Sequence, residues 1–173
     1  HGRGHVLPNY LPDQYYGLPR TDSDVIGWPG SLHSHPNDPE VVGGAVARLV
    51  DEGAEFVMRG DSTGAGKAFG LPTDPVGGGV PIEEWPRAVA ELGIGIAPLA
   101  DTKFNAAKSW LKPLEMSAAG VPWVASPRAE YRRLHALGAG VLAERPRGWH
   151  RELKRLRESA ALRAEWSEAG RAV

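Results

Sequence analysis

Short apolar runs alternate with segments of helical periodicity from residue 24 to the end of the chain, and this alternation restricts the fold more than any other feature. Strands that alternate with helices are typical of βαβ units, whose strands run parallel in one sheet. The sequence therefore predicts an α/β fold built on a parallel sheet. About six strands are expected, among them residues 24–28, 55–58, 94–99, 121–125 and 140–143. The expected helices span residues 39–50, 81–92, 114–119, 129–137 and 147–170.

Residues that commonly begin or end helices stand at these boundaries. Asp38 precedes Pro39, as an N-cap often precedes a proline at the first helical position. Glycine after a helix adopts the left-handed conformation that ends it. Glycines stand where such ends are expected at Gly53, Gly93, Gly120 and Gly138.

Charge and composition exclude several classes of protein. Lys and Arg number 20 against 21 Asp and Glu, so the net charge is −1, without the basic face of nucleic-acid binders. The absence of cysteine excludes disulfides, zinc knuckles and thiol catalysis. No apolar run approaches the roughly 18 to 20 residues of a membrane helix, and the mixed charges of residues 147–170 do not favour membrane association. We expect a soluble domain with no nucleic-acid partner.

Residues 1–23 are expected to form an interdomain linker that lies along the surface of a domain spanning residues 24–173. The stretch from Val6 to Pro12 is rich in proline, and polar residues 21–24 follow it. Neither segment sustains a helix or a central strand. The chain begins at His1 without the pattern of a secretory signal, so we expect a fragment of a cytoplasmic protein.

Ligands of open parallel sheets bind outside the carboxyl ends of the strands, which makes the loops after the strands the places to search. In the first such loop, Gly30 permits close backbone approach and Ser31 offers a hydroxyl, as phosphate-binding loops require. A tight turn explains the same residues. At the end of the second strand, the guanidinium of Arg59 suits a phosphate. The alternative is an ion pair with Asp61 or Glu55.

Three further patterns near these loops carry weaker signals. Residues 60–67 are similar to a nucleotide P-loop, but the glycine spacing is too long and Ala68 replaces the Ser or Thr that would hold Mg²⁺, so we reject an ATP site. His33 and His35 have no third ligand nearby, and no metal is expected. After residues 77–78, the backbone of Gly79 and Val80 can approach a nucleotide base; a tight passage of backbone is the alternative.

Residues 104–120 combine several requirements of a diphosphate site. Pro113 disfavours helix at Lys112 and suits a first helical turn, so a helix should begin near Pro113 with its amides facing the loop. Lys108, Ser109 and Lys112 crowd this positive helix end, which is unfavourable unless an anion lies among them. Glu115 is expected in the first turn, where it either complements the helix dipole or accepts hydrogen bonds from a ribose diol.

At these residues the sequence resembles the carboxyl-terminal, nucleotide-sugar-binding domain of GT-B glycosyltransferases, in particular the retaining family-4 type. The resemblance covers roughly residues 6–157. The matching segments occur in family order and are 7–9, 26–31, 56–61, 79–80 with 85–92, 94–99 and 114–126. The resemblance implies a Rossmann-like three-layer fold, with helices on both faces of a parallel sheet, as one half of a GT-B enzyme.

The resemblance also implies roles for individual residues. In the family, the second of two glutamates seven residues apart grips the ribose and corresponds to Glu115, whereas the first corresponds to Ala107, which has no carboxylate. Either Asn105 or a neighbour is then expected to substitute, or the handling of the donor sugar differs. Trp28 stands where many members have an arginine for the diphosphate, and Lys108, Lys112 or Arg59 is expected to supply the missing charge.

The expected function is that of a glycosyltransferase domain that binds a UDP- or GDP-sugar as donor substrate, with no further cofactor required. An amino-terminal domain of the same protein would hold the acceptor, so the chain alone should bind nucleotide and transfer no sugar. Two alternatives remain open: another GT-B enzyme such as a nucleotide-sugar 2-epimerase, and a non-catalytic sugar-nucleotide-binding or interaction module. The expected binding residues are Gly30, Ser31, Arg59, Gly79, Val80, Asn105, Lys108, Ser109, Lys112 and Glu115.

Overall fold

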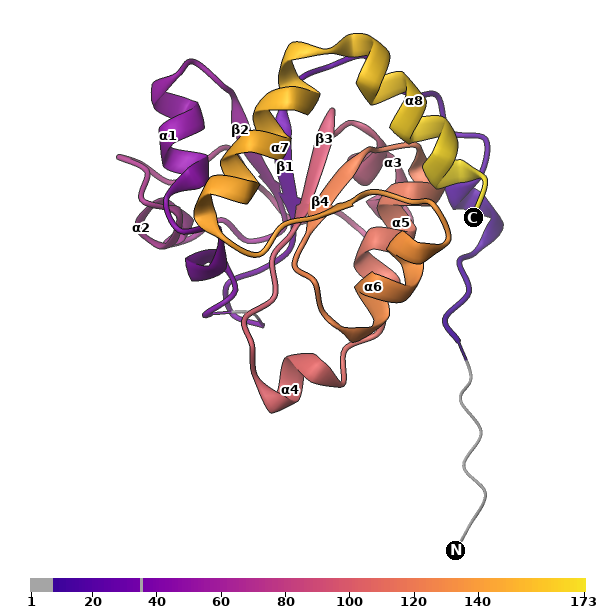
Figure 1. The fold of residues 1–173 in the computed structure, drawn as a ribbon, viewed down its shortest axis with the longest axis horizontal. Helices are drawn as coiled ribbons and strands as arrows, with labels where there is room; N and C mark the ends of the chain where they lie inside the picture. The colour runs from indigo at the N-terminus through magenta and orange to yellow at the C-terminus, as the bar shows by residue number, and fades with distance from the viewer. Residues whose placement is uncertain (1–7, 35) are drawn as a thin grey trace, which may run out of the picture.

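The computed structural model describes residues 8–34 and 36–173. At its centre is a sheet of five parallel strands in the order β2-β1-β3-β4-β5 (Figure 1). The expectation of about six strands is therefore one too high for the part of the chain that is described. The strands are β1 (Ile26–Pro29), β2 (Phe56–Arg59), β3 (Ile94–Ala97), β4 (Trp123–Ala125) and β5 (Val141–Leu142).

Helices cover both faces of the sheet, which confirms the predicted three-layer α/β fold (Figure 1). One face is covered by the 3-10 turn η2 (Pro39–Val42) and by α1 (Ala45–Asp51), α2 (Ala65–Phe69) and α7 (Pro146–Glu158). The other is covered by α3 (Trp85–Ala90), α5 (Leu111–Ala119) and α6 (Ala129–Ala136). The remaining elements are the 3-10 turn η1 (Asp13–Tyr15), α4 (Lys103–Ala106) and α8 (Ala160–Arg171).

Alternation along the strands explains the two cores. Ile26 and Trp28 of β1 face the core that contains α1 and α7, because successive side chains point to opposite faces. Gly27 lies between them on the other face, where an added Cβ would come within 2.2 Å of Leu92. Glycine thus lets the layer containing α3 and α5 pack closely against the sheet.

Two expected helices are interrupted, each for a local reason. The helix expected at 39–50 divides into η2 and α1, because Gly43 and Gly44 both adopt positive φ angles. The helix expected at 147–170 divides at Ser159, whose extended backbone ends α7 and whose hydroxyl accepts a hydrogen bond from the Leu162 amide to cap α8. Asp38 precedes η2 as expected, but its side chain does not cap it. The two short helices α2 and α4 were not predicted.

Segment 8–23 lies against the domain, where arginines of α8 hold it. The Arg163 guanidinium donates to the Asp22 carbonyl at 3.0 Å, and Arg171 donates to the Leu18 carbonyl at 2.6 Å. Figure 1 shows this indigo segment passing the C-terminal end of α8. Residues 1–7 of the expected linker lie outside the described residues, and the boundary at residue 24 stays a prediction.

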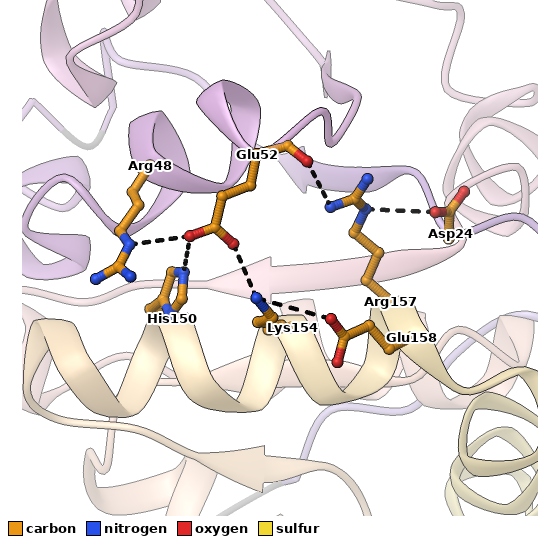
Figure 2. A network of polar contacts seen from close by, with 7 residues as sticks. All are labelled: Asp24, Arg48, Glu52, His150, Lys154, Arg157 and Glu158. Atoms are coloured by element: carbon orange, nitrogen blue, oxygen red, sulfur yellow. Dashed lines mark hydrogen bonds and ion pairs between the residues drawn. The ribbon is translucent and has the colours of Figure 1, made fainter.

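A polar network joins α1 to α7 far along the chain (Figure 2). The carboxylate of Glu52, just after α1, accepts hydrogen bonds from Arg48 at 3.0 Å, from Lys154 at 3.2 Å and pairs with His150 at 3.1 Å. These hydrogen bonds hold the pKa of Glu52 down at about 2, with the bond from Arg48 as the largest cause. In residues 8–34 and 36–173, no helix is long and apolar enough to cross a membrane.

Candidate functional site

A cavity of about 400 Å³ opens where β1 and β2 end. The chain passes from β1 outward to β2 and then returns to β3 on the opposite side of β1, which makes this the topological switch point where open α/β sheets bind ligands. Seven of the ten expected binding residues line it, and they come from the three segments 30–31, 59 and 108–115. They are Gly30, Ser31, Arg59, Lys108, Ser109, Lys112 and Glu115.

Helix α5 begins at Leu111, three residues earlier than expected, and its first turn faces this cavity. Lys112 is helical, so the expectation that Pro113 would exclude it from the helix was wrong. The first four amides of a helix have no acceptor within it, and a proline there costs no hydrogen bond. Glu115 consequently lies in the second turn and not in the first, which removes the helix dipole as the reason for its position.

Lys112 brings positive charge into the interior of the site. Its ammonium donates to the backbone carbonyl of Pro29 and lies 5.7 Å from the centre of the Trp28 ring. Burial lowers the pKa of Lys112 to about 8, against the opposing charges of Glu115 and Asp38. Trp28, which the resemblance aligned with an arginine, is itself buried in the core and does not line the cavity.

Glu115 is held by two residues that the sequence analysis did not place in the site. The Tyr15 hydroxyl donates to Oε1 of Glu115 at 2.5 Å, and the Trp85 indole N–H donates to the same oxygen at 3.2 Å. Burial raises the pKa of Glu115, and the Tyr15 hydrogen bond and the Lys112 charge act against this rise. Burial also raises the pKa of Tyr15, so its hydroxyl remains a donor.

The segment between α4 and α5 supplies the other polar groups of the wall. Lys108 has its ammonium 4.5 Å from the centre of the Phe104 ring. The Ser109 hydroxyl accepts a hydrogen bond from the Leu111 amide at 3.4 Å. Ser31, in the loop after β1, also lines the cavity. The cations Lys108 and Lys112 and the hydroxyls of Ser31 and Ser109 therefore line one cavity beside the first turn of α5, and this arrangement suits an anionic ligand.

Arg59 lines the cavity but already has partners in the protein. Its guanidinium donates to the Glu91 carboxylate at 3.0 Å and to the Ala88 carbonyl at 3.2 Å. The ion pair that the sequence analysis kept as an alternative does form, but with Glu91 and not with Asp61 or Glu55. The other cations that line the cavity are Lys108 and Lys112.

Gly79 and Val80 do not line this cavity. They line a neighbouring depression of about 450 Å³, and Arg59 belongs to both. The glycine segment is anchored to the end of β2, because the Gly60 amide donates to the Gly78 carbonyl at 3.0 Å. An added Cβ at Gly79 would meet no atom within 4 Å, so tight packing does not explain a glycine there.

Asn105 lies outside the cavity, and its side chain connects two loops of the fold. Its side-chain amide donates to Oδ1 of Asp38 at 2.8 Å and to the Ala100 carbonyl at 3.0 Å, and both Asn105 and Asp38 are buried. These bonds join the loops after β1 and β3. Ala107 is exposed and lines a different depression. Neither residue brings a carboxylate into the cavity.

The P-loop-like segment, residues 60–67, binds a side-chain carboxylate of this same chain. Asp74 accepts hydrogen bonds from the amides of Gly66 at 2.7 Å and Gly64 at 2.9 Å, at the start of α2. A carboxylate thus occupies the place that a nucleotide phosphate takes in a P-loop. This contact agrees with the rejection of an ATP site.

Residues missed by the sequence analysis also line the cavity. They are Pro29, Ser34, Gly60, Trp85, Leu111 and Tyr131, and Tyr15 contacts Glu115 through its hydroxyl. Trp85 lay within the family resemblance, but nothing in its spacing indicated a polar role. Tyr15 belongs to a proline-rich stretch without periodicity, which carries no signal of a site.

Comparison with solved structures places this fold among glycosyltransferases. No family model matches the chain, and no curated protein matches its sequence. Sucrose-phosphate synthase from Thermosynechococcus elongatus is 13% identical with a TM-score of 0.73 over 99% of this chain and 48% of that one. WaaG, a glycosyltransferase involved in lipopolysaccharide biosynthesis, is 13% identical with a TM-score of 0.70 over 95% of this chain and 50% of that one. Anabaena HepE in complex with UDP and glucose is 16% identical with a TM-score of 0.65 over 87% of this chain and 43% of that one.

The chain spans half the length of these solved structures or somewhat less. At this level of identity the likeness shows the fold. The parallel sheet with helices on both faces is shared with the GT-B enzymes. This chain therefore has the fold of one half of a GT-B glycosyltransferase.

Proposed function

We propose that this chain is the donor-binding domain of a glycosyltransferase and binds a nucleotide-diphosphate sugar. The observation that carries the proposal is the cavity at the switch point, where Lys108, Lys112 and the first turn of α5 face the same space as Glu115. A diphosphate matches the cations and the helix end. A ribose diol matches the carboxylate of Glu115.

The proposed placement follows the polarity of the walls. The diphosphate lies against Lys108 and Lys112, with the hydroxyls of Ser31 and Ser109 beside it. The base extends past Arg59 toward the depression formed by Gly79 and Val80. Transfer then depends on orientation of the donor and on stabilisation of the leaving diphosphate by these cations. HepE has been solved with UDP and with UDP-glucose, which makes UDP the first nucleotide to test and GDP the second.

The acceptor belongs, in this proposal, to a second domain of the same protein. Support comes from the share of the solved glycosyltransferases that the chain spans, which is 43 to 50% for the three compared above. A donor site at the edge of one domain needs a second surface to hold the acceptor and to exclude water. We expect the isolated chain to bind nucleotide and to transfer no sugar.

One observation supports a second candidate, a non-catalytic sugar-nucleotide-binding module. Ala107 stands at the position of the first family glutamate, and the structure puts it outside the cavity. No described residue of the cavity wall supplies a second carboxylate beside Glu115. An epimerase has less support, because none of the described residues that line the cavity is a histidine.

Titration calorimetry of the purified chain against UDP, GDP, ADP and their sugar conjugates tests the proposal. We expect one nucleoside diphosphate to bind, and Lys112→Ala and Glu115→Ala to weaken it about tenfold or more. Lys103→Ala and Glu83→Ala remove the same charges from exposed positions outside the cavity and are the matched controls. Absence of binding to every nucleotide by a folded chain would contradict the proposal.

A further inference from the structure

Tyr15 connects the segment that precedes the sheet to the carboxylate of the candidate site. Its side chain is only 4% exposed, although it belongs to the stretch expected to lie on the surface as a linker. Its hydroxyl donates to Oε1 of Glu115 at 2.5 Å, across a separation of 100 residues in the chain. A buried hydroxyl with a single well-placed acceptor orients that acceptor as well as itself.

The backbone around Tyr15 is fixed by its own contacts. The 3-10 turn η1 is closed by hydrogen bonds from the Tyr15 amide to Pro12 and from the Tyr16 amide to Asp13. Three residues later, Arg171 holds the carbonyl of Leu18 and also donates to Ala119 at the end of α5. The hydroxyl is therefore presented to Glu115 by an anchored segment.

Both donors to Glu115 use the same oxygen. Tyr15 and Trp85 donate to Oε1, and no described residue donates to Oε2. A carboxylate can accept about four hydrogen bonds, so two donors on one oxygen restrict its rotation and leave the other oxygen for a ligand. A ribose diol presents two hydroxyl donors and needs an acceptor of defined orientation.

We propose that Tyr15 is a positioning residue for ribose recognition: by holding Oε1 of Glu115 it orients Oε2 toward the 2′- and 3′-hydroxyls of the bound nucleotide. This inference rests on the proposed function. It adds that the segment before the sheet contributes to the donor site, through a hydroxyl that does not touch the ligand. Nucleotide affinity and linker conformation are coupled through this one hydrogen bond.

The test compares UDP with its 2′,3′-dideoxy analogue by calorimetry on the wild-type chain and on Tyr15→Phe, which keeps the ring and removes the hydroxyl. If GDP is the nucleotide bound, the guanine pair is used. We expect the wild-type chain to prefer the ribonucleotide about tenfold. Tyr15→Phe should lose most of this preference through weaker binding of UDP, with the dideoxy affinity unchanged. Tyr10→Phe, at an exposed tyrosine, is the control.

A second variant separates orientation from general damage. Glu115→Gln keeps the shape of the side chain and an oxygen acceptor, and should also lose the preference. If Tyr15 acts through Glu115, the double variant should bind UDP no more weakly than Glu115→Gln alone, within about twofold. Circular dichroism melting of each variant confirms that the chain remains folded.

The possible binding results distinguish failure of the proposed function from failure of the role assigned to Tyr15. A wild-type chain that binds no nucleotide overturns the proposed function and this inference with it. A wild-type chain that discriminates, matched by a Tyr15→Phe chain with the same preference, overturns this inference alone. Equal weakening of both nucleotides would show that Tyr15 only packs the fold. Tighter UDP binding by Tyr15→Phe would show that the hydroxyl blocks the carboxylate, which is the opposite of positioning.

Discussion

The ammonium of Lys112, in the first turn of α5, donates a hydrogen bond to the backbone carbonyl of Pro29, the last residue of β1. This contact fixes the cation of the cavity to the end of the central strand. It also keeps the side chain away from bulk water, so burial lowers the Lys112 pKa to about 8. A lysine with that pKa changes its charge within the range in which binding can be measured.

Nucleotide affinity should therefore fall as the pH rises from 7 to 9. Lys112 is mostly protonated below its pKa of about 8 and mostly neutral above it, and the neutral amine no longer attracts the diphosphate. We expect the dissociation constant to rise about tenfold over this interval. Calorimetry at constant ionic strength measures it.

Lys112→Arg is the matched variant for this pH effect, because a guanidinium stays charged throughout. We expect its affinity to change little between pH 7 and pH 9, apart from titration of the ligand itself, which both chains share. An equally steep decline in the arginine variant would assign the pH dependence to another group.

Removal of the Asn105 amide should destabilise the fold more than it weakens nucleotide binding. Asn105→Ala takes one donor from the buried carboxylate of Asp38, which should cost about 1–3 kcal/mol and lower Tm by about 2–10 °C. UDP affinity should change less than about threefold, because Asn105 lies outside the cavity. Asn37→Ala, at an exposed neighbour, is the control. Lost binding with an unchanged Tm would instead make Asn105 a ligand contact.

Gly60 should tolerate alanine poorly, because φ is +126° and an added Cβ would come within 2.4 Å of the Gly30 carbonyl oxygen. Gly60→Ala should lower the free energy of unfolding by roughly 2–4 kcal/mol and weaken nucleotide binding through the displaced loop. Gly138 has a φ of +109° with no atom within 4 Å of an added Cβ, so Gly138→Ala should cost only about 1–2 kcal/mol. Urea denaturation of both measures the difference, and equal losses would refute the contact.

The Glu52 network should stabilise the chain at neutral pH and fail in acid (Figure 2). The folded pKa of about 2 lies below the ordinary value of 4.5, so the stabilisation is fully present above pH 4.5 and is lost as the pH falls toward 2. Glu52→Gln should lower Tm at pH 7, and the difference from wild type should shrink over that window. Because the carboxylate is exposed, high salt should reduce the effect. A difference that persists at pH 2 would contradict this account.

The parallel α/β architecture and the loops that form the cavity follow largely from local patterns, whereas the strand order comes from the structure alone. Apolar runs such as 94–99 mark strands, and glycines such as Gly120, with a φ of +75°, mark helix ends. Since ligands bind beyond the carboxyl ends of parallel strands, these patterns indicated the loops after β1, β2 and β3. Lys108, Ser109 and Lys112 were predicted as binding residues because positive charges near a helix start are a local anomaly in the sequence, and all three line the cavity. The helices predicted from periodicity continued past the glycines at 43–44 and past Ser159. At these positions, backbone conformation and capping end the helices.

Partner choice among polar groups was decided only by tertiary structure. Arg59 pairs with Glu91, 32 residues away; Asn105 pairs with Asp38, 67 residues away; and Glu115 pairs with Tyr15, 100 residues away. Sequence by itself determined the α/β layers, the edge of the sheet at which the cavity lies and the cations near α5, because backbone periodicity and turn preferences act over a few residues. Which buried donor meets which acceptor depends on how distant segments pack, and that packing brought Tyr15, from a segment expected to be a linker, into contact with Glu115 of the cavity.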